Sequence, residues 1–165
     1  MTQPHKALPS LHDVHEYLNQ FTNYERVSDY KLTPSALGTE RIEELLRRLG
    51  SPQIAVPVLH IAGSKGKGST AHLTARLLEA KGYRVGLFTS PHLKDLRERI
   101  IIQGEWIDEF SFCEAFARVQ PVIEEMRDHP HLKPPTYFET LTAMAFVAFE
   151  AAALDVVVLE VGLGG

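Results

Sequence analysis

The feature that most constrains the fold is a strand, a glycine-rich turn, a helix and a second strand in direct succession. Residues 58–62 are apolar except for His60 and indicate a short buried strand, 63–68 a turn, 69–81 a helix and 84–89 the next strand. A helix that joins two strands within about thirty residues forms a right-handed crossover, which makes the strands parallel. The sequence therefore predicts an α/β fold, with a parallel sheet and flanking helices.

The rest of the chain extends this pattern. A small hairpin or an extended excursion around Gly104 is predicted over 99–107, and a long helix opens at Asp108, with a kink or break expected near Pro121. A second, largely apolar helix over 136–153 leads into a buried strand over 155–161.

Two helices are predicted ahead of the sheet. Ser10 is placed to cap a peripheral helix reaching about residue 20, and Thr39 to cap a second helix that Gly50 ends. In the helix after the glycine-rich turn, the side chains expected to face inward are Leu73, Leu77 and Leu78.

Composition narrows the classes of function. The 165 residues are 44% hydrophobic and 23% charged, which suits one globular core. No apolar run is long enough to span a membrane and the first residues do not form a signal peptide, so a cytoplasmic protein is expected. A net charge of −4 without a lysine or arginine run argues against nucleic acid as a partner. The single cysteine, Cys113, lies in an apolar helical pattern and is expected to be a small buried hydrophobe.

The glycine-rich turn carries the strongest chemical signal. Between a strand and a helix, backbone N–H groups and the positive helix end converge on an anion. Lys67 can reach the β- and γ-phosphate oxygens, and Ser69 or Thr70 offers a hydroxyl to Mg²⁺. The turn departs from the standard P-loop, since Gly68 stands where Ser or Thr normally follows Gly-Lys, and a merely tight connection is the alternative. The residues predicted to bind ATP are Gly63, Ser64, Lys65, Gly66, Lys67, Gly68, Ser69 and Thr70.

Two further signals lie at the carboxyl ends of strands, where open parallel sheets bind their ligands. Glu160 ends an apolar strand, where a carboxylate is costly unless it is paired or metal-bound. A Mg²⁺ ligand is the favoured interpretation and a structural ion pair the alternative. Ser90 and His92 follow the second strand of the crossover, either as functional groups or as a simple Ser-Pro turn with a surface histidine.

The helix over 136–153 opens with a capping box. Thr136 is placed to accept a hydrogen bond from the backbone of Glu139, whose carboxylate returns the contact. This structural role is sufficient by itself, so contact between Glu139 and a ligand is the less favoured interpretation.

Taken together, motifs over residues 58–165 resemble the folylpolyglutamate synthase and dihydrofolate synthase family of the Mur-ligase superfamily. They are GSKGKGS at 63–69, TSPHL at 89–93, RERI at 97–100, TYFETLTA at 136–143 and DVVVLEVGLGG at 155–165. The resemblance implies a P-loop-type ATP-binding domain of Mur-ligase-like architecture over 58–165, incomplete at its C-terminus. Residues 1–57 would be a helical segment that packs on it, and the C-terminal domain would be absent.

The resemblance also implies roles for single residues. Lys67 and Glu160 would be catalytic, and Ser69, Ser90 and Glu160 would ligate Mg²⁺. Ser64 and Lys65 replace the family's usual Thr-Asn pair and add a cation near the phosphates. The residues implied to border the pterin substrate are Thr136, Tyr137, Phe138, Glu139, Leu37, Gly38, Thr39 and His92.

The implied reaction joins L-glutamate to dihydropteroate or folate through an acyl phosphate, with ATP and Mg²⁺ as cofactors and ADP as product. The expected partners are these small molecules, with neither nucleic acid nor a membrane, and a monomer is expected for the full-length protein. The fragment alone is expected to be inactive. A Mur-type ligase of peptidoglycan precursors and a non-catalytic nucleotide-binding module are the alternatives.

Overall fold

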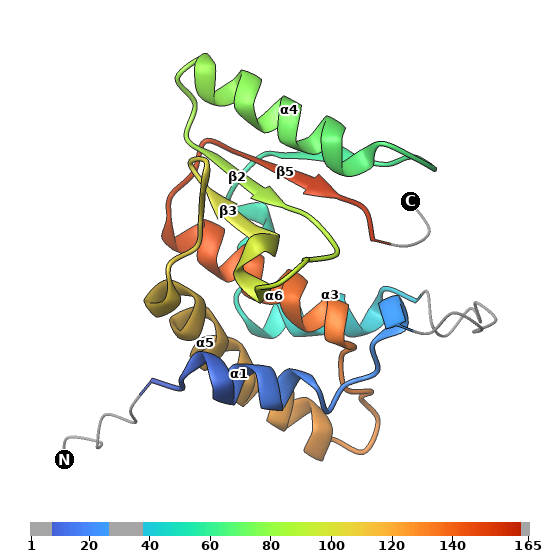
Figure 1. Ribbon diagram of the computed structural model, residues 1–165. Helices are drawn as coiled ribbons and strands as arrows, with labels where there is room; N and C mark the ends of the chain where they lie inside the picture. The colour runs from blue at the N-terminus through green and yellow to red at the C-terminus, as the bar shows by residue number, and fades with distance from the viewer. Residues whose placement is uncertain (1–7, 27–37, 163–165) are drawn as a thin grey trace.

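The computed structural model describes residues 8–26 and 38–162, and its centre is a five-stranded mixed sheet (Figure 1). The strand order is β1-β5-β2-β3-β4. β1, β5 and β2 are parallel, and β3 and β4 add an antiparallel pair beside β2. The predicted α/β class, the parallel pairing and the hairpin are therefore confirmed. The strands are β1 (Val58–Ile61), β2 (Val85–Phe88), β3 (Ile100–Ile102), β4 (Glu105–Trp106) and β5 (Val156–Glu160).

The helices cover the two faces of the sheet unequally. Among the described α-helices, α4 (Lys67–Ala80) lies on one face of the sheet, and the other four lie on the opposite side (Figure 1). Most of the buried apolar side chains belong to this second side, whereas the cluster under α4 is small. No helix in the described ranges is both long and apolar enough to cross a membrane. The four helices are α1 (Leu11–Leu18), α3 (Glu40–Arg48), α5 (Glu109–Asp128) and α6 (Tyr137–Ala151).

The inward face of α4 differs from the prediction. Leu73 and Leu77 are 65% and 68% exposed, and only Leu78 of the three leucines packs against the small cluster. Ala71 and Ala75 are buried instead. These alanines share one helix face with Gly68, and small side chains let the helix lie close to the sheet. The prediction was wrong because it placed the large apolar side chains on the inward face of the helix, whereas the space between the helix and the sheet admits small ones.

Strand β1 is also less buried than predicted. Val58 and Leu59 are 38% and 42% exposed, because β1 is an edge strand that pairs only with β5 among the described strands. A continuous apolar run indicates a strand covered on both faces, which β5 confirms with Val157 and Val158 fully buried.

The helices begin at the predicted capping residues, but three details differ from the prediction. Ser10 forms a full capping box, but α1 is not peripheral, since Val14 is fully buried. Thr39 occupies the N-cap of α3 without a side-chain cap, because its hydroxyl donates to the Glu43 carboxylate at 2.6 Å. Helix α5 continues through Pro121 without a break, held by buried residues on both sides. Cys113 is buried, as predicted, and burial raises the pKa of its thiol.

A buried ion pair joins α3 to the start of α6. Nε of Arg41 lies 3.0 Å from Oε2 of Glu139, with side chains 12% and 11% exposed. The same oxygen accepts the backbone N–H of Thr136 at 2.6 Å. The hydrogen bond to Glu139 raises the pKa of Arg41 further above its usual range. This contact sets the place of α3 against α6.

We expect Arg41→Met to lower the free energy of unfolding by about 3 kcal/mol, because it leaves the Glu139 carboxylate buried without its cation. The double variant Arg41→Met, Glu139→Gln should recover part of that loss, and Arg47→Met on the same helix is the control, since Arg47 is 66% exposed. Urea denaturation followed by circular dichroism measures all three. Equal losses for Arg41→Met and Arg47→Met would contradict the structural role of the pair.

The exposed leucines of α4 should promote self-association of the chain. We expect the double variant Leu73→Lys, Leu77→Lys to remain monomeric at concentrations where the unchanged chain associates, because it removes exposed apolar surface. Its melting temperature should change little, since neither side chain is buried. Size-exclusion chromatography with light scattering measures the first effect, and Ala71→Lys, which places a charge under the helix, is the contrasting variant that should unfold the chain.

Candidate functional site

The glycine-rich turn delivers an uncapped helix end to the carboxyl edge of the sheet. Gly66, at the N-cap of α4, adopts a left-handed conformation with φ of 75°, which glycine tolerates best. In the part of the chain that the structure describes, no side chain caps this end of the helix. The first N–H groups of α4 are therefore available to an anion, and the positive end of the helix favours a negative charge there.

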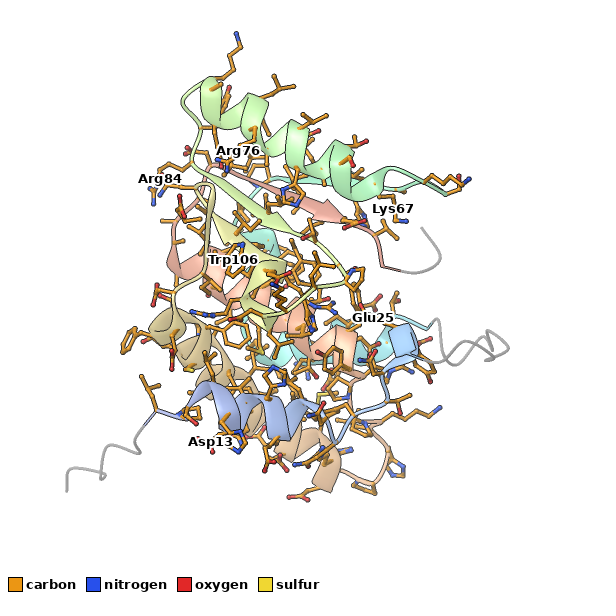
Figure 2. The ribbon with its side chains drawn as sticks, in the orientation of Figure 1. Asp13, Glu25, Lys67, Arg76, Arg84 and Trp106 are labelled. Atoms are coloured by element: carbon orange, nitrogen blue, oxygen red, sulfur yellow. The ribbon has the colours of Figure 1, made fainter. Side chains whose placement is uncertain are left out.

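Lys67 is the first residue of α4, and its side chain approaches Gly63 at the start of the turn. Its Cγ would lie 3.8 Å from a Cβ placed on Gly63. Figure 2 shows Lys67 at the end of α4 that meets the turn. No carboxylate within the described ranges forms an ion pair with it, so its charge is not neutralised by that part of the chain.

Glu160 lies against the same turn. Its side chain is 9% exposed, and a Cβ on Gly68 would lie 3.4 Å and 3.5 Å from its two carboxylate oxygens. Oε2 accepts the backbone N–H of Ser90 at 3.1 Å. The structure thus brings Glu160, Ser90 and the start of α4 together. Within the described ranges no arginine, lysine or histidine pairs with Glu160, so the ion pair considered above is not formed there.

The donor set at this point fits Mg²⁺. A carboxylate and a hydroxyl are hard oxygen ligands, and Mg²⁺ usually takes one or two protein carboxylates while waters and phosphates complete its shell. Where the chain is described, no group of three or more acidic, histidine or cysteine side chains could hold a metal alone. Glu160 and Ser90 would therefore hold Mg²⁺ jointly with a phosphate ligand at the start of α4. Ser69 and Thr70 lie in the first turn of that helix, exposed to solvent.

His92 belongs to a second group of residues, centred on Arg99. Arg99 donates from Nε to Nδ1 of His92 at 2.8 Å and pairs with Glu25 through both terminal nitrogens. Burial and the neighbouring Arg99 charge lower the pKa of His92. Tyr137 lies under the same guanidinium, 5.7 Å from its carbon to the ring centre. The sequence analysis predicted no role for Arg99 or Glu25. The position of Arg99 directly before the apolar run 100–102 could have indicated a buried charge.

The predicted substrate residues of α6 lie next to this group. Tyr137 is buried, and its backbone N–H donates to the Thr22 carbonyl at 3.1 Å. Phe138 is half-buried, with its ring 5.8 Å from that of Phe88 and against Gly162. Phe138 is thus the aromatic side chain of this turn that is still partly accessible.

Thr136 and Glu139 form the predicted capping box, and Glu139 also pairs with Arg41. That ion pair brings the start of α3, with Gly38 and Thr39, close to the start of α6. Leu37 lies outside the described residues. A hollow of about 470 Å³ next to Arg41 is lined by residues of α3, α5 and the 131–133 segment, and none of them belongs to the phosphate turn.

Comparisons with known proteins agree with this geometry. A scan against models of protein families finds no match. A probable bifunctional folylpolyglutamate synthase/dihydropteroate synthase of Haloferax volcanii is 40% identical over 154 residues, which is 93% of this chain and 17% of the relative. The Mycobacterium tuberculosis folylpolyglutamate synthase in complex with ADP superposes with a TM-score of 0.81 at 37% identity, covering 94% of this chain and 32% of that one.

A solved complex of a folylpolyglutamate synthase with AMPPCP and folate also has a TM-score of 0.81, at 34% identity. It covers 95% of this chain and 36% of its own. The chain thus spans about a third or less of the proteins it matches, which have a Mur-ligase-like fold. In sequence and in fold, the 165 residues belong to the folylpolyglutamate synthase and dihydrofolate synthase family.

Proposed function

We propose that this chain is the nucleotide-binding part of an ATP-dependent ligase that joins L-glutamate to the carboxylate of a folate or of dihydropteroate. The observation that carries the proposal is the uncapped start of α4 beside Lys67, with Glu160 and Ser90 at the same edge of the sheet. This arrangement suits a triphosphate with its metal. The relatives complexed with ADP, and with AMPPCP and folate, support the same assignment.

In this proposal residues 63–70 bind the phosphates of ATP. Backbone N–H groups of the turn and of the first turn of α4 donate to phosphate oxygens, and the Lys67 ammonium neutralises the β- and γ-phosphates. Lys65 adds a second cation, and the hydroxyls of Ser69 and Thr70 face the same anion. Glu160, Ser90 and Ser69 would hold Mg²⁺, which would supply further charge neutralisation when bound.

The proposed reaction runs in two displacements. An oxygen of the substrate carboxylate attacks the γ-phosphorus, the bond to the β-phosphate oxygen breaks, and ADP leaves. The glutamate nitrogen then attacks the acyl carbon, phosphate leaves, and the nitrogen loses a proton. Neither step needs a protein nucleophile, so the contribution of these residues is positioning and electrostatic stabilisation.

The remaining assignments are part of the same proposal. Residues 1–57 form the helical segment and 58–165 the first part of the ATP-binding domain. The starts of α3 and α6, with His92, border the pterin substrate, and Phe138 offers an aromatic face for stacking. A cytoplasmic location and a monomeric state of the full-length protein complete the proposal.

The test is chemical trapping. A full-length ligase containing this chain, given ATP, a folate substrate and hydroxylamine in place of glutamate, should form a hydroxamate from the acyl phosphate, with ADP and phosphate as products. Release of AMP and pyrophosphate would replace this mechanism with adenylation. Dihydropteroate and folate in separate reactions distinguish the two substrate classes.

Lys67→Ala should reduce hydroxamate formation at least tenfold and weaken ATP binding, because it removes a charge-assisted contact worth roughly 1.5–3 kcal/mol. Lys81→Ala, at the opposite end of the same helix, is the matched control and should change neither quantity. Calorimetry and product assays measure both. An unaltered Lys67→Ala enzyme would end the phosphate-turn assignment.

Glu160→Gln keeps the shape of the side chain and an oxygen for the Ser90 N–H. We expect the Mg²⁺ concentration needed for nucleotide binding to rise while the melting temperature changes little, because the described residues give Glu160 no cation to lose. Glu79→Gln on α4 is the control. A large fall in melting temperature with unchanged Mg²⁺ dependence would assign Glu160 a structural role.

A further inference from the structure

The RERI segment, residues 97–100, has no role in the proposed chemistry, yet it holds the loop that follows β2 in place. The carboxylate of Glu98 accepts three backbone N–H groups, from Leu93 at 2.7 Å and from Lys94 and Asp95 at 2.9 Å each. These bonds to the charged form lower the pKa of Glu98. The carboxylate thereby closes the loop directly after His92.

Arg99 is the next residue and is 1% exposed. One guanidinium contacts three segments that lie far apart in the sequence. Its Nη1 and Nη2 donate to the Glu25 oxygens at 2.9 Å and 2.6 Å, and its central carbon lies over the Tyr137 ring. Its Nε donates to His92 at 2.8 Å. A charge this deeply buried is tolerated because the Glu25 carboxylate and the hydrogen bonds compensate it.

The contact with His92 has a definite chemical consequence. A guanidinium carries only N–H donors and stays protonated, so Nδ1 of His92 has to be the acceptor. In the neutral ring the proton then resides on Nε2. Within the described ranges, Nε2 of His92 has no protein acceptor, and the side chain is half-buried rather than enclosed. The ring therefore offers a single N–H donor of fixed orientation.

The surroundings indicate what this donor faces. Glu25 follows Thr22, whose carbonyl accepts the N–H of Tyr137, and Phe138 comes next with a partly accessible ring. Figure 2 shows Glu25 beside the start of α6, on the side of the sheet opposite α4. The group around Arg99 is thus held near the residues assigned to the pterin substrate rather than on the α4 side.

We propose that Arg99 is a positioning residue for substrate binding: it fixes the orientation and tautomer of His92, which presents Nε2–H to an oxygen acceptor of a folate-type substrate. Arg99 does not touch the substrate itself. The identity of the substrate rests on the proposed function, but the fixed tautomer does not.

The tautomer is tested on the 165-residue chain by ¹⁵N-resolved NMR of the histidine rings at about pH 8, where an ordinary histidine is neutral. His92 should show an unprotonated, hydrogen-bonded Nδ1 and a protonated Nε2. In Arg99→Gln the ring should become a mixture of tautomers. Arg97→Gln is the matched control, since Arg97 pairs with Asp95 in the same segment without touching His92, and it should leave the His92 signals unchanged.

The variant Glu25→Gln distinguishes the contribution of Arg99 to stability from its effect on the orientation of His92. It removes the charge that compensates Arg99 but keeps the Arg99 contact with His92, so the melting temperature should fall while the tautomer stays fixed. If Arg99→Gln leaves the His92 tautomer unchanged, or if Arg97→Gln alters it equally, the positioning role is refuted.

The substrate arm uses a full-length ligase containing this chain. His92→Ala, which removes a half-buried side chain and should fold, is expected to raise KM for the folate-type substrate about fivefold to tenfold, the effect of losing one hydrogen bond. KM for ATP should not change. Arg99→Gln should likewise raise KM for the folate-type substrate and leave KM for ATP unchanged. An unchanged folate KM in His92→Ala would overturn the substrate role. A fixed tautomer in an enzyme that accepts no folate-type substrate would instead refute the proposed function and leave the positioning role of Arg99 in place.

Discussion

The close approach of α4 to the sheet is the constraint on which the rest of the structure depends. Gly68 lies against the Glu160 carboxylate, and Ala71 and Ala75 continue the same small-residue face along the helix. With larger side chains on this face, α4 would stand further from β5. Its uncapped amides would then no longer reach the carboxyl edge where Ser90 and Glu160 meet.

That constraint also explains the departure from the standard P-loop. A Ser or Thr in place of Gly68 would bring a hydroxyl into the space beside both Glu160 oxygens. Here the backbone N–H of Ser90 is bonded to that carboxylate instead. In the proposed Mg²⁺ site, Ser90 in the loop after β2 would offer the oxygen that a P-loop usually supplies from its own helix.

Sequence patterns predicted the helices and strands well where a capping residue or a regular spacing of apolar residues defined them. The Thr136 box, the Asp108 cap and the crossover unit required only local information. Burial was predicted less well, because Leu73 and Val58 are exposed for reasons of packing and strand order that no local window contains. The network around Arg99 was missed for the same reason, since Arg99 and Glu25 are 74 positions apart.

Because one buried guanidinium contacts Glu25, His92 and Tyr137 at once, we expect these positions to depend on one another in evolution. Replacing Glu25 alone leaves a buried cation, and replacing Arg99 alone leaves a carboxylate and an imidazole without their donor. A substitution at one of these positions should therefore cost less stability when the others change with it. Substitutions in the segment around Glu25 and in the RERI segment should therefore occur together, although 74 positions separate them.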